Sequence, residues 1–427
     1  MDSNSIRIAI LGLNYSPEPT GNAPYTTSLA EGLKSLGYQV RVITAHPHYP
    51  EWAIRSGYGA WTSKESIRGV PVRRLRHWVP SKPVGLKRLL SEISFGVRVL
   101  FSRLGRPDVV LLVSPALFAS ALALVKIRIS SPKTSVGLWV QDLYSLGITE
   151  TQQGTDLIAK VMATIEARTL SSADGVVVIH DRFREYATAA LGVAPDKIEV
   201  IRNWSHLQPH ESGDRAAVRA RLGWTDNETV VLHAGNQGLK QGLENLVDAA
   251  RHSLERGLPI RFVLLGSGSQ RSHIESLARG VTSVDFLDAL PDDQFQDVLR
   301  SADVLVVNER PGLAEMAVPS KLTTYFSTGL PVIAVTDEGS ITAHEIALSR
   351  GGVRVNTASP ADLCKAVMEM RENKTFSKQL GENGLTFRRE VLGSAAAISK
   401  YADWLLGLAK LRGRPGRASR FTNIGDK

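Results

Sequence analysis

The chain has 427 residues, which is too long for one domain of ordinary size and suits two domains of roughly 200 residues. Its 43% apolar and 22% charged residues are typical of a soluble globular protein. The net charge is +9, and the single cysteine, Cys364, excludes an intramolecular disulfide and fits a reducing cytoplasm. Cysteine and histidine nowhere cluster with the spacing of a zinc site, so no metal cofactor is expected.

The N-terminal segment 7–13, RIAILGL, predicts a first buried strand. It lacks the basic start of a signal peptide, so we expect a cytoplasmic protein. The next segment, NYSPEPTGNAP at 14–24, leads into the helical segment TTSLAEGLKSLG. Eleven residues are long for a strand-to-helix connection, which favours a functional loop.

Positive charge is concentrated between residues 55 and 106, where twelve Lys or Arg residues stand against two Glu residues. Within this region, segment 86–104 combines an apolar stripe with flanking bases. Three tryptophans accompany it: Trp52, Trp61 and Trp78. A basic amphipathic segment near Trp is typical of contact with an anionic membrane surface, here the inner face of the plasma membrane. The alternatives are a solvated basic face of a core helix and capture of an anionic acceptor. Nucleic-acid binding is not expected, because no RNA or DNA motif accompanies the charge.

The run 109–125 has 17 residues without charge and contains Pro115. About 20 apolar residues are needed to span a bilayer, so we expect a buried strand, VVLLV, followed by a buried helix. The next strand candidate, TSVGLWV, ends at Gln141 and Asp142. Polar ligands of parallel sheets bind where strands end, which makes Asp142 a candidate site residue. A cap on the following helix is the alternative role.

Strand and helix signals alternate along the whole chain. The strand candidates are RIAILGL, QVRVITA, VVLLV, TSVGLWVQD, GVVVIH, KIEVIRN, VVLHAG, IRFVLLGSG, SVDFLDAL, VLVVNE and VIAV. Continuous apolar strands between amphipathic helices indicate parallel sheets covered on both faces. We therefore predict two doubly wound α/β domains, 1–205 and 206–393, divided at a polar, turn-rich segment. A helix over 394–411 and a basic, disordered tail over 412–427 complete the chain.

Two turns of the second half have the features of phosphate sites. Gly235 to Gly242, GNQGLKQG, lies between a buried strand and a helix. About 80 residues later, Ser320 is a candidate helix N-cap with Lys321 in the first turn. Lysine is unfavourable beside the positive end of a helix dipole unless an anion binds there. Two such turns indicate a nucleotide-diphosphate ligand.

Four motifs carry a resemblance to a known family: NYSPEPTGNAPYTTSLAEGL, VQDL, AGNQGLKQGL and PSKLTTYFSTGLPV. In this order and at these spacings, the chain resembles retaining glycosyltransferases of the GT4 group, in the branch of the colanic-acid-type transferases of bacterial polysaccharide biosynthesis. The resemblance covers residues 6 to 410. It implies the GT-B fold, in which two Rossmann-like domains face each other across a cleft. It also implies that the helix over 394–411 returns to the first domain.

The resemblance also suggests roles for individual residues. Gly21 and Asn22 match the turn that approaches the donor phosphates and the acceptor. Asp142 matches an aspartate that orients the acceptor hydroxyl or the donor sugar. Gly266 opens the loop beside the nucleobase. We therefore assign Asp142 to catalysis and the glycine loops to donor binding.

The chain departs from the family pattern at the diphosphate turn and at a pair of glutamates. Asn236 and Gln241 stand where the family has cations, and Lys240 is the neighbouring candidate for a phosphate contact. The two Glu positions of the family are Met316 and Thr324. Glu315, one residue away, is the remaining carboxylate candidate for catalysis, and Thr324 is a candidate for the ribose.

The expected function is transfer of a sugar from a nucleotide-diphosphate donor to a lipid-linked or oligosaccharide acceptor. The resemblance implies retention of the anomeric configuration without a metal or a covalent nucleophile. Ser320, Lys321 and Lys240 would stabilise the departing diphosphate. A sugar-nucleotide 2-epimerase of the same fold and a non-catalytic scaffold are the alternatives.

Overall fold

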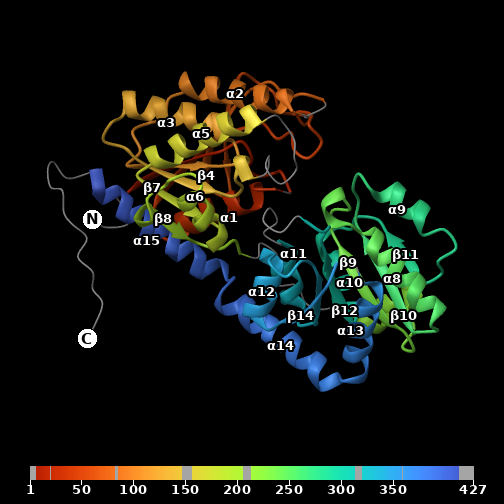
Figure 1. Cartoon of the computed structure of the whole chain (residues 1–427). Coiled ribbons are helices and arrows are strands. Elements are labelled where there is room, and N and C mark those ends of the chain that lie inside the picture. The colour runs from red at the N-terminus through yellow and green to blue at the C-terminus, as the bar shows by residue number, and fades with distance from the viewer. Residues whose placement is uncertain are drawn as a thin grey trace, which may run out of the picture. The chain divides into compact units, whose positions relative to one another are not determined.

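The computed structural model describes residues 6–19, 21–81, 85–146, 156–204, 213–312, 320–357 and 359–412. By their internal contacts, these residues divide into two compact units (Figure 1). The first unit contains the described residues up to Arg202 and those from Ala397 to Arg412. The second unit contains Asn203–Ala396. Each unit is built on its own sheet.

The first unit contains an eight-stranded sheet in the order β3-β4-β2-β1-β5-β6-β7-β8. The strands are β1 (Arg7–Leu11), β2 (Gln39–Ala45), β3 (Thr62–Ile67), β4 (Val70–Leu75), β5 (Val109–Val113), β6 (Ser135–Val140), β7 (Gly175–Val178) and β8 (Ile198–Val200). All pair in parallel except β3, which forms an antiparallel hairpin with β4. The strand order reverses at β1, which lies between β2 and β5. Such a reversal opens a crevice outside the carboxyl ends of the strands.

Helices cover both faces of this sheet, and Figure 1 shows α2, α3 and α5 on one side and α1 and α15 on the other. The helices are α1 (Ala23–Ser35), α2 (Leu86–Leu100), α3 (Leu117–Ser130), α5 (Asp156–Ser172), α6 (Asp181–Ala189), the 3-10 turn η2 (Pro195–Lys197) and α15 (Ser394–Arg412). Strands β5 and β6 are buried along their whole length. Burial on both faces explains why their sequences are continuously apolar rather than alternating.

The last helix packs on the first sheet at two glycines. A Cβ atom added at Gly137 would lie 2.6 Å from the Trp404 ring, and one at Gly175 would lie 2.9 Å from Leu408. Ser135 Oγ donates to the Leu408 carbonyl at 2.7 Å. These strand positions therefore lack side chains because α15 occupies the space.

The second unit contains a six-stranded sheet in the order β11-β10-β9-β12-β13-β14, with every pair parallel. The strands are β9 (Thr229–Ala234), β10 (Ile260–Leu265), β11 (Val284–Leu287), β12 (Val304–Asn308), β13 (Val332–Val335) and β14 (Gly352–Val355). This is the order of a dinucleotide-binding Rossmann sheet, which reverses between β9 and β12. The two predicted doubly wound α/β domains are thus confirmed.

The helices of the second unit are α7 (Arg215–Leu222), η3 (Leu239–Gln241), α8 (Glu244–Glu255), α9 (Arg271–Leu277), α10 (Asp292–Ser301), α11 (Ser320–Tyr325), η4 (Phe326–Thr328), α12 (Ile341–Ser349), α13 (Pro360–Glu372) and α14 (Lys374–Glu390). Alternate residues of one strand enter opposite cores: Val231 joins one apolar cluster, whereas Val230 and Leu232 join the other. The period of two places both sides of the strand in apolar surroundings.

Every strand candidate taken from the sequence corresponds to a strand, but β3, β4 and β14 were missed. The hairpin β3-β4 lies at the sheet edge and β3 is only half-buried, so its sequence TSKESI carries no apolar run. β14 is four residues long and lies at the other sheet's edge. None of the helices in the described part of the chain has the length and hydropathy of a membrane span.

Candidate functional site

The sequence turns singled out in the second half meet at the reversal point of the second sheet. Gly235 follows β9, and Asn308 ends the neighbouring strand β12. Asn308 Nδ2 donates to the carbonyls of Gln241 and Gly242 at 2.7 and 2.9 Å. The loops after the two strands are therefore tied to each other at the edge where ligands of such sheets bind.

The glycine-rich turn is held by a close backbone approach. Gly235 and Gly266 have φ values of 122° and 128°, in the left-handed region that side chains disfavour. A Cβ atom at Gly266 would lie 2.2 Å from the Gly235 carbonyl oxygen. The buried Gln237 fixes the same contact, because its backbone N–H donates to the Ser267 carbonyl at 2.8 Å. Gly266 therefore positions the turn itself.

Lys321 is the cation that lies against this turn. It is the second residue of α11, and its Cε atom would be 3.1 Å from a Cβ atom at Gly235. Burial lowers its pKa to about 8, against an opposing effect of Glu309. His233, inside β9, is fully buried, and burial together with Lys321 lowers its pKa. Of Lys321 and His233, Lys321 is therefore the one that carries a positive charge near neutral pH.

Glu309 is a half-buried carboxylate that the sequence interpretation missed. It directly follows β12 and accepts hydrogen bonds from the hydroxyls of Thr336 and Thr342. Burial raises its pKa, while these hydroxyls and Lys321 act in the opposite direction. Its place directly after the run VLVVN was the available signal, because residues at strand ends line the ligand edge.

The other predicted donor residues are less enclosed. Asn236 and Lys240 are exposed, and Thr324 is half-buried on α11. Ser320 begins α11, as expected for its position near a helix start, although its side chain is outside the description. Glu315 lies outside the described residues, as does Met316. Of the two lysines predicted to contact phosphate, Lys321 is half-buried against the turn and Lys240 is exposed.

A second site lies at the reversal point of the first sheet, where Gly21 and Asn22 help to line a cavity of about 220 Å³. The turn after β1 requires glycine at 21, where φ is 66° and the Tyr49 ring is close. Asn22 Nδ2 donates to the Ser114 carbonyl at 3.1 Å, which ties this loop to the one after β5. Nothing in the sequence revealed that the basic helix α2 also contributes to this cavity.

Helix α2 contributes the carboxylate of Glu92 to this cavity. Glu92 of α2 is 4% exposed, and its Oε1 accepts a hydrogen bond from the Tyr144 hydroxyl. Its Oε2 has no hydrogen-bond partner among the described residues. Burial raises the pKa of Glu92 to about 7, and the hydrogen bond from Tyr144 and the charge of Arg88 partly offset this. The cavity therefore contains a carboxylate that titrates near neutral pH.

Asp142 lies next to this group and is half-buried. Its Oδ1 accepts from the backbone N–H of Leu143 at 2.9 Å. The chain after it is held by a different carboxylate, since Glu166 accepts from the N–H groups of Tyr144 and Ser145 at 2.8 and 3.0 Å. Asp142 is not among the residues that line the cavity. Of the two carboxylates, Glu92 has the more direct access to a bound molecule.

No group of three or more metal-ligating side chains occurs in the part of the chain that the structure describes. His46 and His48 have separate partners. The His46 ring contacts the Ala60 carbonyl through Nε2 at 2.8 Å, whereas His48 Nδ1 contacts the His46 backbone carbonyl at 2.9 Å and lies 3.3 Å from the buried carboxylate of Glu18. Glu18 also accepts the N–H groups of His48 and Tyr49, so its role is to hold this loop.

Comparison with known proteins identifies two matching domain families. Residues 20–204 match the glycosyl transferase 4-like domain, and residues 228–373 match the glycosyl transferases group 1 domain. WcaI of Escherichia coli (strain K12), named as a glycosyl transferase of colanic acid biosynthesis, is 33% identical over 338 residues. The match covers 76% of this chain and 82% of WcaI.

Solved structures share the architecture at low sequence identity. Sucrose-phosphate synthase from Thermosynechococcus elongatus superimposes with a TM-score of 0.72 and 18% identity, over 95% of this chain and 100% of that chain. HepE of Anabaena in complex with UDP gives a TM-score of 0.68 and 15% identity, over 94% and 100% of the two chains. The shared fold includes both units.

The buried charge of Lys321 predicts a pH-dependent cost in stability. The lysine pKa falls from 10.5 to about 8 in the folded chain, so the unfolded chain binds more protons between these values. The stability of the wild type should therefore rise over this pH window. Lys321→Met should be the more stable protein at pH 7 by on the order of 2 kcal/mol, and the difference should shrink toward pH 10.5.

Urea denaturation of both proteins at several pH values measures this difference. Lys374→Met, which removes an exposed lysine of the same unit, is the matched control and should leave the stability within about 0.5 kcal/mol. A Lys321→Met protein less stable than the wild type at pH 7 would contradict the assignment of a desolvated cation.

Proposed function

The chain belongs to this family of glycosyltransferases, the GT4 group with the GT-B fold, and we propose that it moves a sugar from a nucleotide-diphosphate donor to a lipid-linked or oligosaccharide acceptor in cell-surface polysaccharide biosynthesis. The observation that carries the proposal is Lys321, half-buried against a glycine turn at the reversal point of the second sheet, where burial lowers its pKa. The binding of UDP by HepE, which has the same fold, supports a nucleotide ligand.

The surroundings of Lys321 favour an anion as its partner. Among the described residues no ion pair joins its ammonium to a carboxylate, although Glu309 is near enough to raise its pKa. A buried charge is costly unless it is paired. A diphosphate at the turn would supply the missing negative charge and would also meet the N–H groups at the start of the helical segments. Gly235 leaves the room for that approach.

In the proposed reaction, the bond between the anomeric carbon and the diphosphate oxygen breaks, and a bond to the acceptor oxygen forms on the same face. The departing diphosphate keeps the bonding electrons, and it takes the proton of the acceptor hydroxyl. Lys321 stabilises the negative charge that develops on the leaving group. Retention follows from attack on the face that the diphosphate leaves, without a covalent enzyme intermediate.

The acceptor hydroxyl is proposed to bind in the cavity of the first unit. Its lining includes Gly21, Asn22, His48 and Glu92, whose buried Oε2 has no hydrogen-bond partner among the described residues. An ionised Glu92 would accept a hydrogen bond from the hydroxyl and orient it for attack. Arg88, whose guanidinium lies 5.9 Å from the centre of the Tyr144 ring, lines the same cavity.

A panel of nucleoside diphosphates tests the donor site. At about 100 times Kd, the nucleotide of the true donor should raise the Tm by roughly 5 °C, and the others should raise it less. Lys321→Met should abolish the shift because the diphosphate loses its buried cation. Lys374→Met should retain it. An unchanged Tm with each of UDP, GDP, TDP and ADP would refute the donor site and point to a non-catalytic scaffold. Conversion of the donor sugar without any acceptor would point to an epimerase.

Glu92→Gln tests the acceptor site, because glutamine keeps the size of the side chain and removes its charge. Transfer should fall by about 10- to 100-fold, the value of one hydrogen bond to a charged group. The wild-type rate should rise as pH passes through about 7, where Glu92 ionises, and the variant rate should not. The nucleotide-induced Tm shift should be unchanged. An unchanged pH profile in Glu92→Gln would rule out this role.

Peripheral membrane association is proposed for the outer surface of α2 and α3. Four apolar side chains of the α2 segment are exposed, Leu86, Leu90, Val97 and Phe101, and α3 adds Val125 and Ile129. The exposed Lys87 and Arg106 accompany them. Arg74 does not contribute, because it is fully buried and pairs with Glu65. An apolar stripe bordered by bases matches an anionic lipid surface.

Phe101→Asp tests this surface, since Phe101 is 82% exposed and its replacement should leave the fold intact. Sedimentation with phosphatidylglycerol vesicles should carry down the wild type and at least about tenfold less of the variant. The control is Leu36→Asp, another exposed leucine of the first unit. Equal sedimentation of all three proteins would exclude this surface as the anchor.

A further inference from the structure

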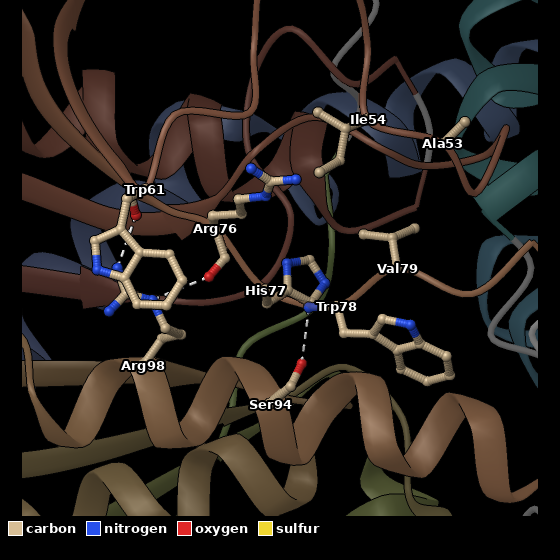
Figure 2. Close-up of a pocket in the computed structure, with 9 residues that line it drawn as sticks. All are labelled: Ala53, Ile54, Trp61, Arg76, His77, Trp78, Val79, Ser94 and Arg98. Atoms are coloured by element: carbon tan, nitrogen blue, oxygen red, sulfur yellow. Dashed lines mark hydrogen bonds between the residues drawn. The ribbon is translucent and has the colours of Figure 1, made fainter.

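A larger cavity of about 560 Å³ lies beside the proposed acceptor cavity, between the end of β4 and α2 (Figure 2). Its wall combines bases with aromatic rings. The lining residues are Ala53, Ile54, Trp61, Arg76, His77, Trp78, Val79, Ser94 and Arg98. This volume lies within the range of small-molecule sites, roughly 300–1,000 Å³. The proposed transfer does not by itself use these residues.

Arg98 is fixed at the wall of the cavity without a counter-ion. It donates to the carbonyls of Trp61 and Arg76 at 2.7 and 3.1 Å, and its guanidinium lies 3.6 Å from the centre of the Trp61 ring. Neither Arg98 nor Arg76 forms an ion pair with a carboxylate among the residues that the structure places. Carbonyl groups hold the guanidinium in place but leave its charge uncompensated.

His77 adds a second, independent sign of a ligand. It is 6% exposed, and neither ring nitrogen has a hydrogen-bond partner in the described part of the chain. Burial, together with His48 and His46, lowers its pKa to about 3, so the ring is neutral and one nitrogen carries a proton. A buried N–H group without an acceptor is unfavourable unless a ligand supplies one. Figure 2 shows its ring between Arg76 and Ser94.

The cavity is linked on one side to the proposed acceptor cavity. The rings of His48 and His77, which line the two cavities, have their centroids 4.9 Å apart. Ser91 and Ser94 lie one turn apart on α2, and both hydrogen-bond to the Trp78 backbone: Ser91 Oγ donates to its carbonyl and Ser94 Oγ accepts from its N–H. Ser91 lines the acceptor cavity and Ser94 lines the larger one. A molecule held in the larger cavity therefore lies close to the hydroxyl site.

On the other side the cavity adjoins the apolar stripe. Ser94 and Arg98 alternate along α2 with Leu90, Val97 and Phe101, which are exposed. Residues three and four apart share one face of a helix. This face of α2 therefore places exposed apolar side chains beside the cationic wall of the cavity. Such a pair of surfaces matches a lipid with an anionic headgroup.

We infer that this cavity binds the diphosphate group of a lipid-linked acceptor, with its lipid chain along the exposed stripe of α2 and its sugar in the Glu92 cavity. Arg76 and Arg98 pair with the phosphate oxygens, and the ring N–H of His77 donates to one of them. The inference rests on the proposed glycosyl transfer, since it assigns the acceptor of that reaction.

Fluorescence titration with farnesyl diphosphate tests the site, because Trp61 and Trp78 are exposed at the cavity and report on a bound ligand. Arg76→Gln should weaken binding about tenfold, and Arg76→Gln with Arg98→Gln at least about a hundredfold. Arg103→Gln removes an exposed arginine outside the lining and should bind as the wild type does. Inorganic pyrophosphate should bind at least about tenfold more weakly than farnesyl diphosphate, since it lacks the lipid chain.

Three outcomes would overturn the inference. Equal losses in Arg76→Gln and Arg103→Gln would mean that binding follows net charge. Equal affinities for pyrophosphate and farnesyl diphosphate would remove the lipid chain from the site. A response to phosphatidylglycerol vesicles alone that depends on Arg76 would make the cavity a phospholipid site. The nucleotide-induced Tm shift, measured in the wild type and in Arg76→Gln, separates these outcomes from failure of the proposed function. If neither protein shows the shift, the proposed transferase function is refuted. If both show the shift and Arg76→Gln binds farnesyl diphosphate as the wild type does, only the acceptor cavity is refuted.

Discussion

The parallel sheet with both faces buried is the constraint from which the chemistry of this chain follows. Strands such as β5 and β6 are buried along their whole length and mostly apolar because helices cover them on both sides. The polar side chains of the two candidate sites therefore lie in the loops at the ends of the strands, and the reversal of strand order separates these loops. Gly21 and Glu92 meet at this point in the first unit, and Gly235 and Lys321 meet at it in the second.

Lys321 shows how such a site stores free energy for binding. An ammonium group that loses its water without gaining a carboxylate destabilises the empty protein. In the proposed reaction a diphosphate would return that energy on binding, and would return more as negative charge accumulates on the leaving group. Glu309 lies close enough to limit the cost but is itself held by two hydroxyls. The arrangement keeps the lysine charged near neutral pH while leaving it available to a ligand.

The sequence was sufficient for the parallel architecture and for the location of Lys321. Continuous apolar runs identified the buried strands, and the helix-start pattern correctly placed Lys321 in the first turn of α11, where the anion site stays a prediction. Strands β3 and β14 were beyond its reach, because an edge strand with a wet face has no distinctive pattern. Glu92 was also missed, since only the packing of α2 on α3 and the contact of Glu92 with Tyr144 reveal that its carboxylate is buried. Likewise, spacing alone did not separate the exposed Lys240 from the enclosed Lys321.

The docking of α15 on the first sheet has a consequence for how the chain is made. Gly137 and Gly175 leave a surface that Trp404 and Leu408 fill, yet these residues follow the second unit in the sequence. During synthesis the second unit emerges complete before the first one does. The first unit therefore cannot complete its fold, and part of its apolar sheet stays uncovered, until the ribosome has translated α15.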